Sequence, residues 1–93
     1  MPQEVDLDHL PTFPKRLPEK LKSIRERLGL TPDEIALLVG ARTGAEILAY
    51  ENDEDDLLVT VLWNYSKLAG CPIDQILYDN LEVQFRDLKT VNV

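Results

Sequence analysis

The feature that most constrains this chain is a helix start at residues 31–34. The run TPDE there supplies a capping hydroxyl, a proline suited to the first helical position, and a glutamate three residues after the cap. This spacing predicts a capping box, and the two acids also suit the positive end of a helix. Gly40 provides the stop, so this helix is expected to span about two turns.

Apolar residues at helical spacing predict four more short helices. The repeats place these helices at about residues 18–28, 45–51, 58–69 and 72–77. Trp63 falls on the longest apolar stripe, where it is expected to join the core rather than an interface. The sequence thus predicts an all-α, five-helix domain over residues 17–80.

The two ends of the chain differ from this helical body. Residues 1–16 are broken by prolines and show no helical period, so an extended N-terminal arm is expected. Residues 81–93 form a C-terminal tail whose LEVQF run alternates apolar and polar residues as a β-strand does. A lone strand needs a partner, which a second copy of the chain can supply. Val83 and Phe85 are therefore predicted at a dimer interface, because a tail beyond five helices has little core of its own to join.

Composition and the one cysteine indicate the broad class of protein. With 93 residues, of which 44% are hydrophobic and 29% charged, the chain suits one globular domain. No run approaches the roughly eighteen apolar residues that a membrane helix requires. The start of the chain lacks the basic region and apolar run of a signal peptide, and Cys71 has no partner for an internal disulfide. A cytoplasmic protein with no membrane partner is expected.

The net charge of −7 is distributed unevenly along the chain. Residues 15–50 carry a net charge of +2, whereas residues 1–14 carry −3 and residues 51–93 carry −6. An overall negative charge opposes binding to nucleic acid, because such binding neutralises phosphates with Lys and Arg. The bases gather on one early element, so their distribution matters more than the total.

Several motifs carry a resemblance to a known family. They are L-x-x-I-R-x-x-x-G-L-T at 21–31, E-I-A-x-x-V-G at 34–40, I-x-x-Y-E-N at 47–52 and LAGCPIDQIL at 68–77. Together with a short turn between the second and third helices, they resemble the lambda-repressor-like helix-turn-helix family of bacterial and phage regulators, also called the xenobiotic-response-element family. The resemblance covers residues 17–80.

This resemblance implies a sequence-specific DNA-binding transcriptional regulator, a repressor, that acts as a homodimer on double-stranded DNA. The helix around residues 42–52 would enter the major groove. There Arg42 can bridge a guanine, Glu46 can accept from a cytosine amino group, and Asn52 can meet a phosphate. The residues expected at the DNA are Arg42, Thr43, Gly44, Glu46, Ala49 and Asn52 on the third helix and its turn, with Lys20 and Lys22 on the first helix.

The same resemblance implies a structural ion pair. The family joins an Arg on the first helix to the Glu that closes the third, and these positions are Arg25 and Glu51. Removal of one partner would leave the other charge stranded, which costs more than the pair itself contributes.

Two departures from the family pattern keep a second hypothesis open. Pro32 stands where members commonly carry a Gln that holds a phosphate, and the acids at 53–56 stand where members usually have Gly and then basic residues. Carboxylates there repel phosphates and forfeit the counterion release that drives binding. The alternative is a protein–protein interaction module on the same fold, whose acidic face at residues 51–56 meets a basic protein partner.

Nothing in the sequence points to an enzyme, a metal site or a cofactor. His9 and Cys71 are each alone of their kind, whereas a metal site needs three or four ligands at suitable spacing. There is no Gly-rich phosphate loop and no nucleophile elbow. The acidic run at 53–56 lacks the glycine and the later glutamate of a calcium-binding EF-hand. We therefore predict no catalytic activity and no bound metal or cofactor.

Overall fold

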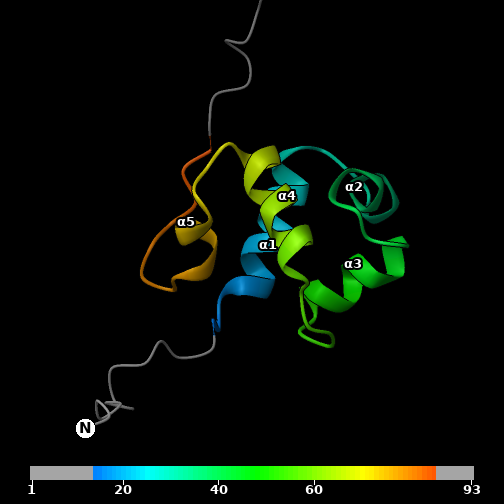
Figure 1. Ribbon diagram of the computed structural model, residues 1–93, viewed down its shortest axis with the longest axis horizontal. Coiled ribbons are helices and arrows are strands. Elements are labelled where there is room, and N and C mark those ends of the chain that lie inside the picture. The colour runs from blue at the N-terminus through cyan, green and yellow to red at the C-terminus, as the bar shows by residue number, and fades with distance from the viewer. Residues whose placement is uncertain (1–13, 86–93) are drawn as a thin grey trace, which may run out of the picture.

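The computed structural model describes residues 14–85, and among these residues it contains five α-helices and no strand. The helices are α1 (Leu17–Arg27), α2 (Pro32–Val39), α3 (Gly44–Glu51), α4 (Val59–Ala69) and α5 (Ile73–Leu77) (Figure 1). The all-α, five-helix prediction is confirmed, and each helix begins and ends within about one residue of the expected position. The strand predicted from the LEVQF run is wrong for residues 81–85. The predicted arm before residue 14 and the tail after residue 85 lie outside the described residues.

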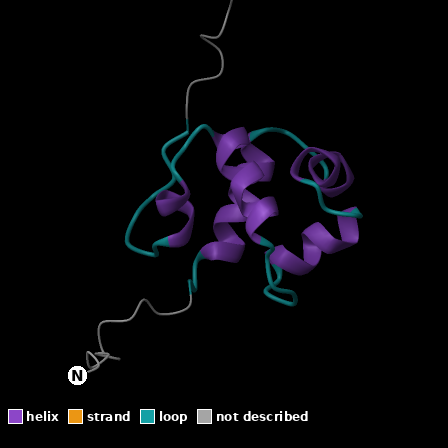
Figure 2. Ribbon diagram, in the orientation of Figure 1, coloured by secondary structure: helices purple, strands orange, loops and turns teal. Residues whose placement is uncertain are grey.

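Helices α1 and α4 run through the middle of the molecule. Helix α5 lies on one side of this central pair, and α2 and α3 lie on the other (Figures 1 and 2). Every helix contributes apolar side chains to a single core, among which the largest fully buried ones are Tyr65, Leu21, Ile24, Ile35, Ile47, Ile76, Val39 and Val61. The core therefore fixes the position of α3 relative to α1 and α4.

The caps of α2 form as the sequence predicts. The Glu34 N–H donates to Thr31 Oγ1 at 3.2 Å, and the Thr31 N–H donates to Glu34 Oε1 at 2.8 Å. At the other end, Gly40 adopts the left-handed conformation with φ of 84°. Only glycine takes this conformation without a steric penalty, so α2 is limited to two turns by its own sequence.

The described part of the tail is fastened to α1 by Lys20. The Lys20 ammonium donates to the carbonyl oxygens of Gln75, Tyr78 and Leu81 at 2.8, 2.7 and 2.7 Å. The residue is only 3% exposed, and burial lowers the pKa of its ammonium. All three donors are used, so the structure does not support the predicted contact between Lys20 and DNA. Arg16 adds a second attachment through two hydrogen bonds to Glu82, at 2.7 and 2.9 Å.

Val83 and Phe85 lie against the core of their own chain. Both are half-buried, and the Arg27 guanidinium lies 4.7 Å from the centre of the Phe85 ring. The expectation that the tail has no core to join is therefore wrong, and with it the reason for placing these two side chains at a dimer interface. The attachments through Lys20 and Arg16 explain why residues 81–85 pack as an irregular segment.

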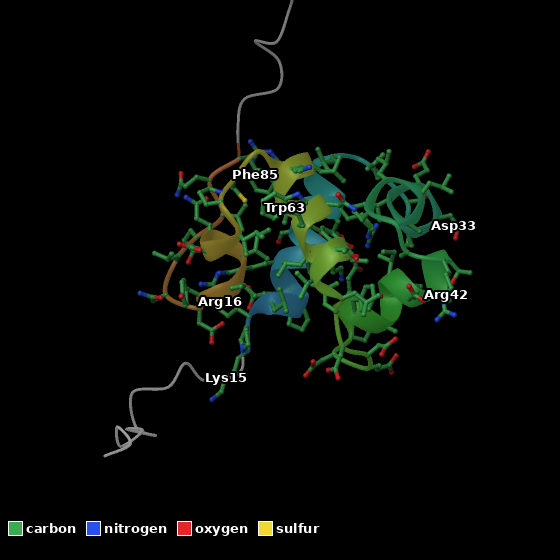
Figure 3. The ribbon with its side chains drawn as sticks, in the orientation of Figure 1. Lys15, Arg16, Asp33, Arg42, Trp63 and Phe85 are labelled. Atoms are coloured by element: carbon green, nitrogen blue, oxygen red, sulfur yellow. The ribbon has the colours of Figure 1, made fainter. Side chains whose placement is uncertain are left out.

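Trp63 also differs from its prediction. It lies on α4 but is 52% exposed, with the Lys67 ammonium 5.4 Å from the ring centre (Figure 3). The core positions of α4 are filled by Val61, Leu62 and Tyr65 instead. Trp63 thus belongs to the surface of the domain.

No helix among residues 14–85 is both long and apolar enough to cross a membrane. In the same part of the chain, no three His, Cys, Asp or Glu side chains gather as a metal site would require.

Candidate nucleic-acid interface

Helices α2 and α3 are joined by a carboxylate at their shared turn. Asp33, in the first turn of α2, accepts the Gly44 N–H that begins α3, with a distance of 3.0 Å to its Oδ1. A Cβ atom at Gly44 would overlap this carboxylate and would lie 2.8 Å from the Asp33 nitrogen. Gly44 is buried and serves to bring the two helices together. It offers no side chain to a base.

The start of α3 carries a three-residue hydrogen-bond network. Glu46 Oε2 accepts from Arg42 Nε at 3.0 Å, and Glu46 Oε1 accepts from the Arg42 backbone N–H at 3.3 Å. The Tyr50 hydroxyl donates to the same Oε1 at 3.1 Å. Glu46 and Tyr50 are four residues apart on α3 and so lie on the same side of the helix, whereas Arg42 lies in the turn just before the Thr43 cap.

The network leaves its three members in different environments. The Arg42 side chain is 89% exposed, whereas that of Glu46 is 13% exposed. The Arg42 backbone N–H, followed by the Arg42 and Tyr50 side chains, holds the pKa of Glu46 below its usual range. Burial and the bond to Glu46 raise the pKa of Tyr50 to about 12. Glu46 is therefore a fixed carboxylate, and Arg42 is the basic group that the start of α3 presents to the surroundings (Figure 3).

The other residues predicted at the DNA are spread over several elements. Thr43 is exposed and caps α3, because its Oγ1 accepts the Glu46 N–H at 3.3 Å. Ala49 is half-buried on α3, and Asn52 is exposed at its C-terminal end. Lys22 is exposed but lies on α1. The structure thus gathers Arg42, Thr43 and Glu46 at one end of α3, with Asn52 at the other.

The predicted ion pair between Arg25 and Glu51 is present in the structure. Arg25 Nε and Nη2 donate to the two carboxylate oxygens of Glu51 at 2.7 and 3.1 Å. The two side chains are 13% and 3% exposed, and Arg25 Nη1 also donates to the Leu30 carbonyl at 3.1 Å. This paired geometry fixes the end of α3 on α1, so both residues are structural.

The acids at residues 53–56 line the exposed loop between α3 and α4. Each of the four is exposed, and among residues 14–85 none is joined to a base by an ion pair. The helix α4 begins only at Val59 and has no acid in its first turn. These carboxylates therefore do not cap α4 and remain as a negative edge beside the C-terminal end of α3.

Sequence reasoning missed two contacts at this site. The hydrogen bond between Asp33 and Gly44 joins residues on separate helices, and no local sequence pattern predicts it. The Glu46 to Tyr50 bond does have a signal, since these two residues follow the spacing of four that brings side chains together on a helix.

No protein-family model matches this chain, and neither does any curated protein. Among solved structures, the P22 c2 repressor protein in complex with synthetic operator 9T in the presence of Tl⁺ is similar to it, with a TM-score of 0.62 and 22% sequence identity. The similarity covers 69% of this chain and 96% of that chain. This chain therefore shares the fold of that repressor protein. Helices α2 and α3, joined by a short turn, form a helix-turn-helix pair, with Glu46 and Tyr50 on its second helix and Arg42 in the turn.

Proposed function

We propose that this chain is a transcriptional regulator of the bacterial or phage type that binds double-stranded DNA through α3. The observation that carries the proposal is the shared fold, because a repressor solved on a synthetic operator matches this chain over 96% of its own length. The exposed Arg42 at the start of α3 supports the proposal further, since Arg is the side chain that most often reads guanine in the major groove.

The charges around α3 limit how strongly it can attract the phosphates of DNA. The charge of Arg42 is offset by Glu46, and the acids at 53–56 repel phosphates. One copy of the domain therefore gains little from phosphate contacts. We propose that the regulator is a cytoplasmic repressor that acts as a homodimer, because two copies on a two-fold site double the number of base contacts. Val83 and Phe85 are left out of this dimer contact, since both pack on their own chain.

Selection of duplexes from a random library by the full chain, at low salt, tests this function. The expected result is a recurring two-fold motif, with a logarithm of the binding constant that falls linearly with the logarithm of salt concentration. A selection that returns no motif at low salt contradicts the proposal. Thr60→Ala is a suitable control variant, because Thr60 is exposed and lies on α4 rather than on α3.

A second function is favoured by one specific observation. The carboxylates at 53–56 are exposed and have no ion-pair partner among the described residues, so they are free to attract a basic protein. Affinity purification followed by titration of each recovered protein tests this alternative. Binding that disappears when the four acids become Asn and Gln, in a chain that selects no DNA motif, would replace DNA binding as the proposed function.

A further inference from the structure

Glu46 holds Arg42 by only part of its guanidinium group. The carboxylate accepts from Arg42 Nε at 3.0 Å and from the Arg42 backbone N–H at 3.3 Å. Within residues 14–85, Nη1 and Nη2 of Arg42 donate to no other group. The two terminal nitrogens therefore keep their donors while the inner part of the side chain is fastened to α3.

The fastening point is itself rigid. Glu46 is in the first turn of α3, its side chain is 13% exposed, and its Oε1 also accepts from the Tyr50 hydroxyl. Tyr50 is 4% exposed and belongs to the core. A path of hydrogen bonds thus leads from the core through Tyr50 and Glu46 to the exposed Arg42. A long exposed side chain ordinarily samples many rotamers, and this path restricts Arg42 before any ligand arrives.

The donors left free on Arg42 match one base in particular. Guanine presents two acceptors, O6 and N7, on its major-groove edge, and a guanidinium meets both with two N–H groups. Adenine, cytosine and thymine do not present such a pair of acceptors there. A guanidinium held at Nε is suited to this contact, because its terminal nitrogens stay free and oriented.

The geometry points to Arg42 as a guanine-reading residue that Glu46 positions for the contact. This inference rests on the proposed function and deepens it, since it names the base and the residue that governs its recognition. Glu46 then acts through Arg42 and is a positioning residue. The earlier expectation that Glu46 accepts directly from a cytosine amino group fits less well, because both of its oxygens already accept hydrogen bonds and its side chain is largely buried.

The same arrangement gives Glu46 two opposite effects on DNA binding. Its negative charge weakens the attraction of Arg42 to any phosphate, whereas its hydrogen bonds favour the orientation that reads guanine. Glu46 therefore lowers sequence-independent affinity and raises discrimination between bases. These effects separate in variants, because Glu46→Gln removes the charge but keeps one acceptor oxygen, and Glu46→Ala removes the charge and both acceptors.

The experiment measures the full base preference of the binding site for the wild type, Glu46→Gln, Glu46→Ala and Arg42→Lys. The wild type is expected to prefer guanine at one position of each half-site by roughly 5- to 150-fold. Glu46→Ala and Arg42→Lys are expected to lose most of that preference, the latter because an ammonium has no fork of donors. Glu46→Gln is expected to keep part of the preference and to bind all sequences more tightly. Glu54→Gln removes a charge beyond the other end of α3 and should leave the guanine preference unchanged.

Thermal unfolding of each variant shows whether it keeps the fold. If Glu46→Ala does not fold, Arg42→Lys still tests whether Arg42 reads guanine. A guanine preference equal to the wild type in either folded variant, Glu46→Ala or Arg42→Lys, overturns the inference while DNA binding stands. A uniform loss over all sequences in Arg42→Lys also overturns it, because that pattern marks a phosphate contact. A wild type that selects no motif removes the proposed function itself, which is a distinguishable failure.

Discussion

At the scale of single residues, three carboxylates determine what the helix-turn-helix pair presents. Asp33 takes the first N–H of α3, Glu46 holds Arg42, and Glu51 binds Arg25. Each carboxylate is directed at the chain's own donors. The acids of the loop at 53–56, in contrast, form no ion pair within residues 14–85. The charged groups that α3 exposes are therefore determined by these internal hydrogen bonds.

Gly44→Ala is expected to destabilise the domain by about 1–3 kcal/mol, because the added methyl group would overlap the Asp33 carboxylate and crowd its backbone nitrogen. Urea unfolding of the variant measures this loss. In the double variant with Asp33→Ala the carboxylate is gone, so the cost of the methyl group should fall. Equal costs of Gly44→Ala with and without Asp33 would contradict the steric explanation.

At the scale of elements, α1 acts as the attachment point for the segment after α5. Lys20 bonds three carbonyl oxygens of residues 75–81, and Arg16 bonds Glu82 and the Asp79 carbonyl. The carbonyl groups at the end of a helix lack hydrogen-bond donors within the helix, and here a buried ammonium donates to them. Residues 78–85 are therefore a structural part of the domain.

Lys20→Met is expected to lower the free energy of unfolding by about 2 kcal/mol, since the apolar stem is kept and the three charge-assisted hydrogen bonds are lost. Lys22→Met is the matched control, because Lys22 is exposed on the same helix and its loss should change stability by less than about 0.5 kcal/mol. Urea unfolding of both variants gives the comparison. Equal effects of the two substitutions would show that the three hydrogen bonds of Lys20 contribute nothing to stability.

These two cases explain what the sequence could predict at the level of elements. The ends of α2 are set by Thr31, Glu34 and Gly40, which lie within ten residues of one another, so local rules locate them. The bonds of Lys20 join residues 55 to 61 positions apart. Sequence periodicity does not predict contacts between residues so far apart in the chain. It also does not distinguish a base that is exposed from one that is buried. The fold was therefore predictable, whereas the assignment of bases to surface or core was not.

At the scale of the whole molecule, ionised acids stabilise the fold. The Arg16 and Lys15 backbone N–H groups hold the pKa of Asp79 below its usual range, and the Arg16 side chain lowers the pKa of Glu82. The hydrogen bond from the Arg42 backbone N–H likewise lowers the pKa of Glu46. A carboxyl group with a lowered pKa in the folded state stabilises it above the unfolded pKa, and this contribution is lost as pH falls through the folded pKa.

The stability of the domain is accordingly expected to decrease as the pH falls below about 4.5. The double variant Asp79→Asn and Glu82→Gln should be less stable at neutral pH and should lose less stability on acidification. Urea unfolding between about pH 3 and pH 7 measures both trends. A double variant whose stability depends on pH as steeply as that of the wild type would contradict the assignment to these two acids.

The whole molecule is also where fold and charge oppose each other. The fold is shared with a repressor solved on a synthetic operator, yet the net charge of −7 and the free acids at 53–56 work against phosphate contacts. Base recognition through a positioned Arg42 would therefore have to contribute a large share of the affinity. Binding of that kind depends strongly on sequence and only weakly on salt.

The most direct test of DNA binding through α3 is an anisotropy titration of the selected duplex, over a series of salt concentrations, with wild type and Arg42→Ala. We predict a shallow salt dependence for the wild type and a loss of at least about tenfold in affinity for Arg42→Ala on the selected site. Equal affinity of the two proteins for the selected duplex at every salt concentration would contradict DNA recognition by α3.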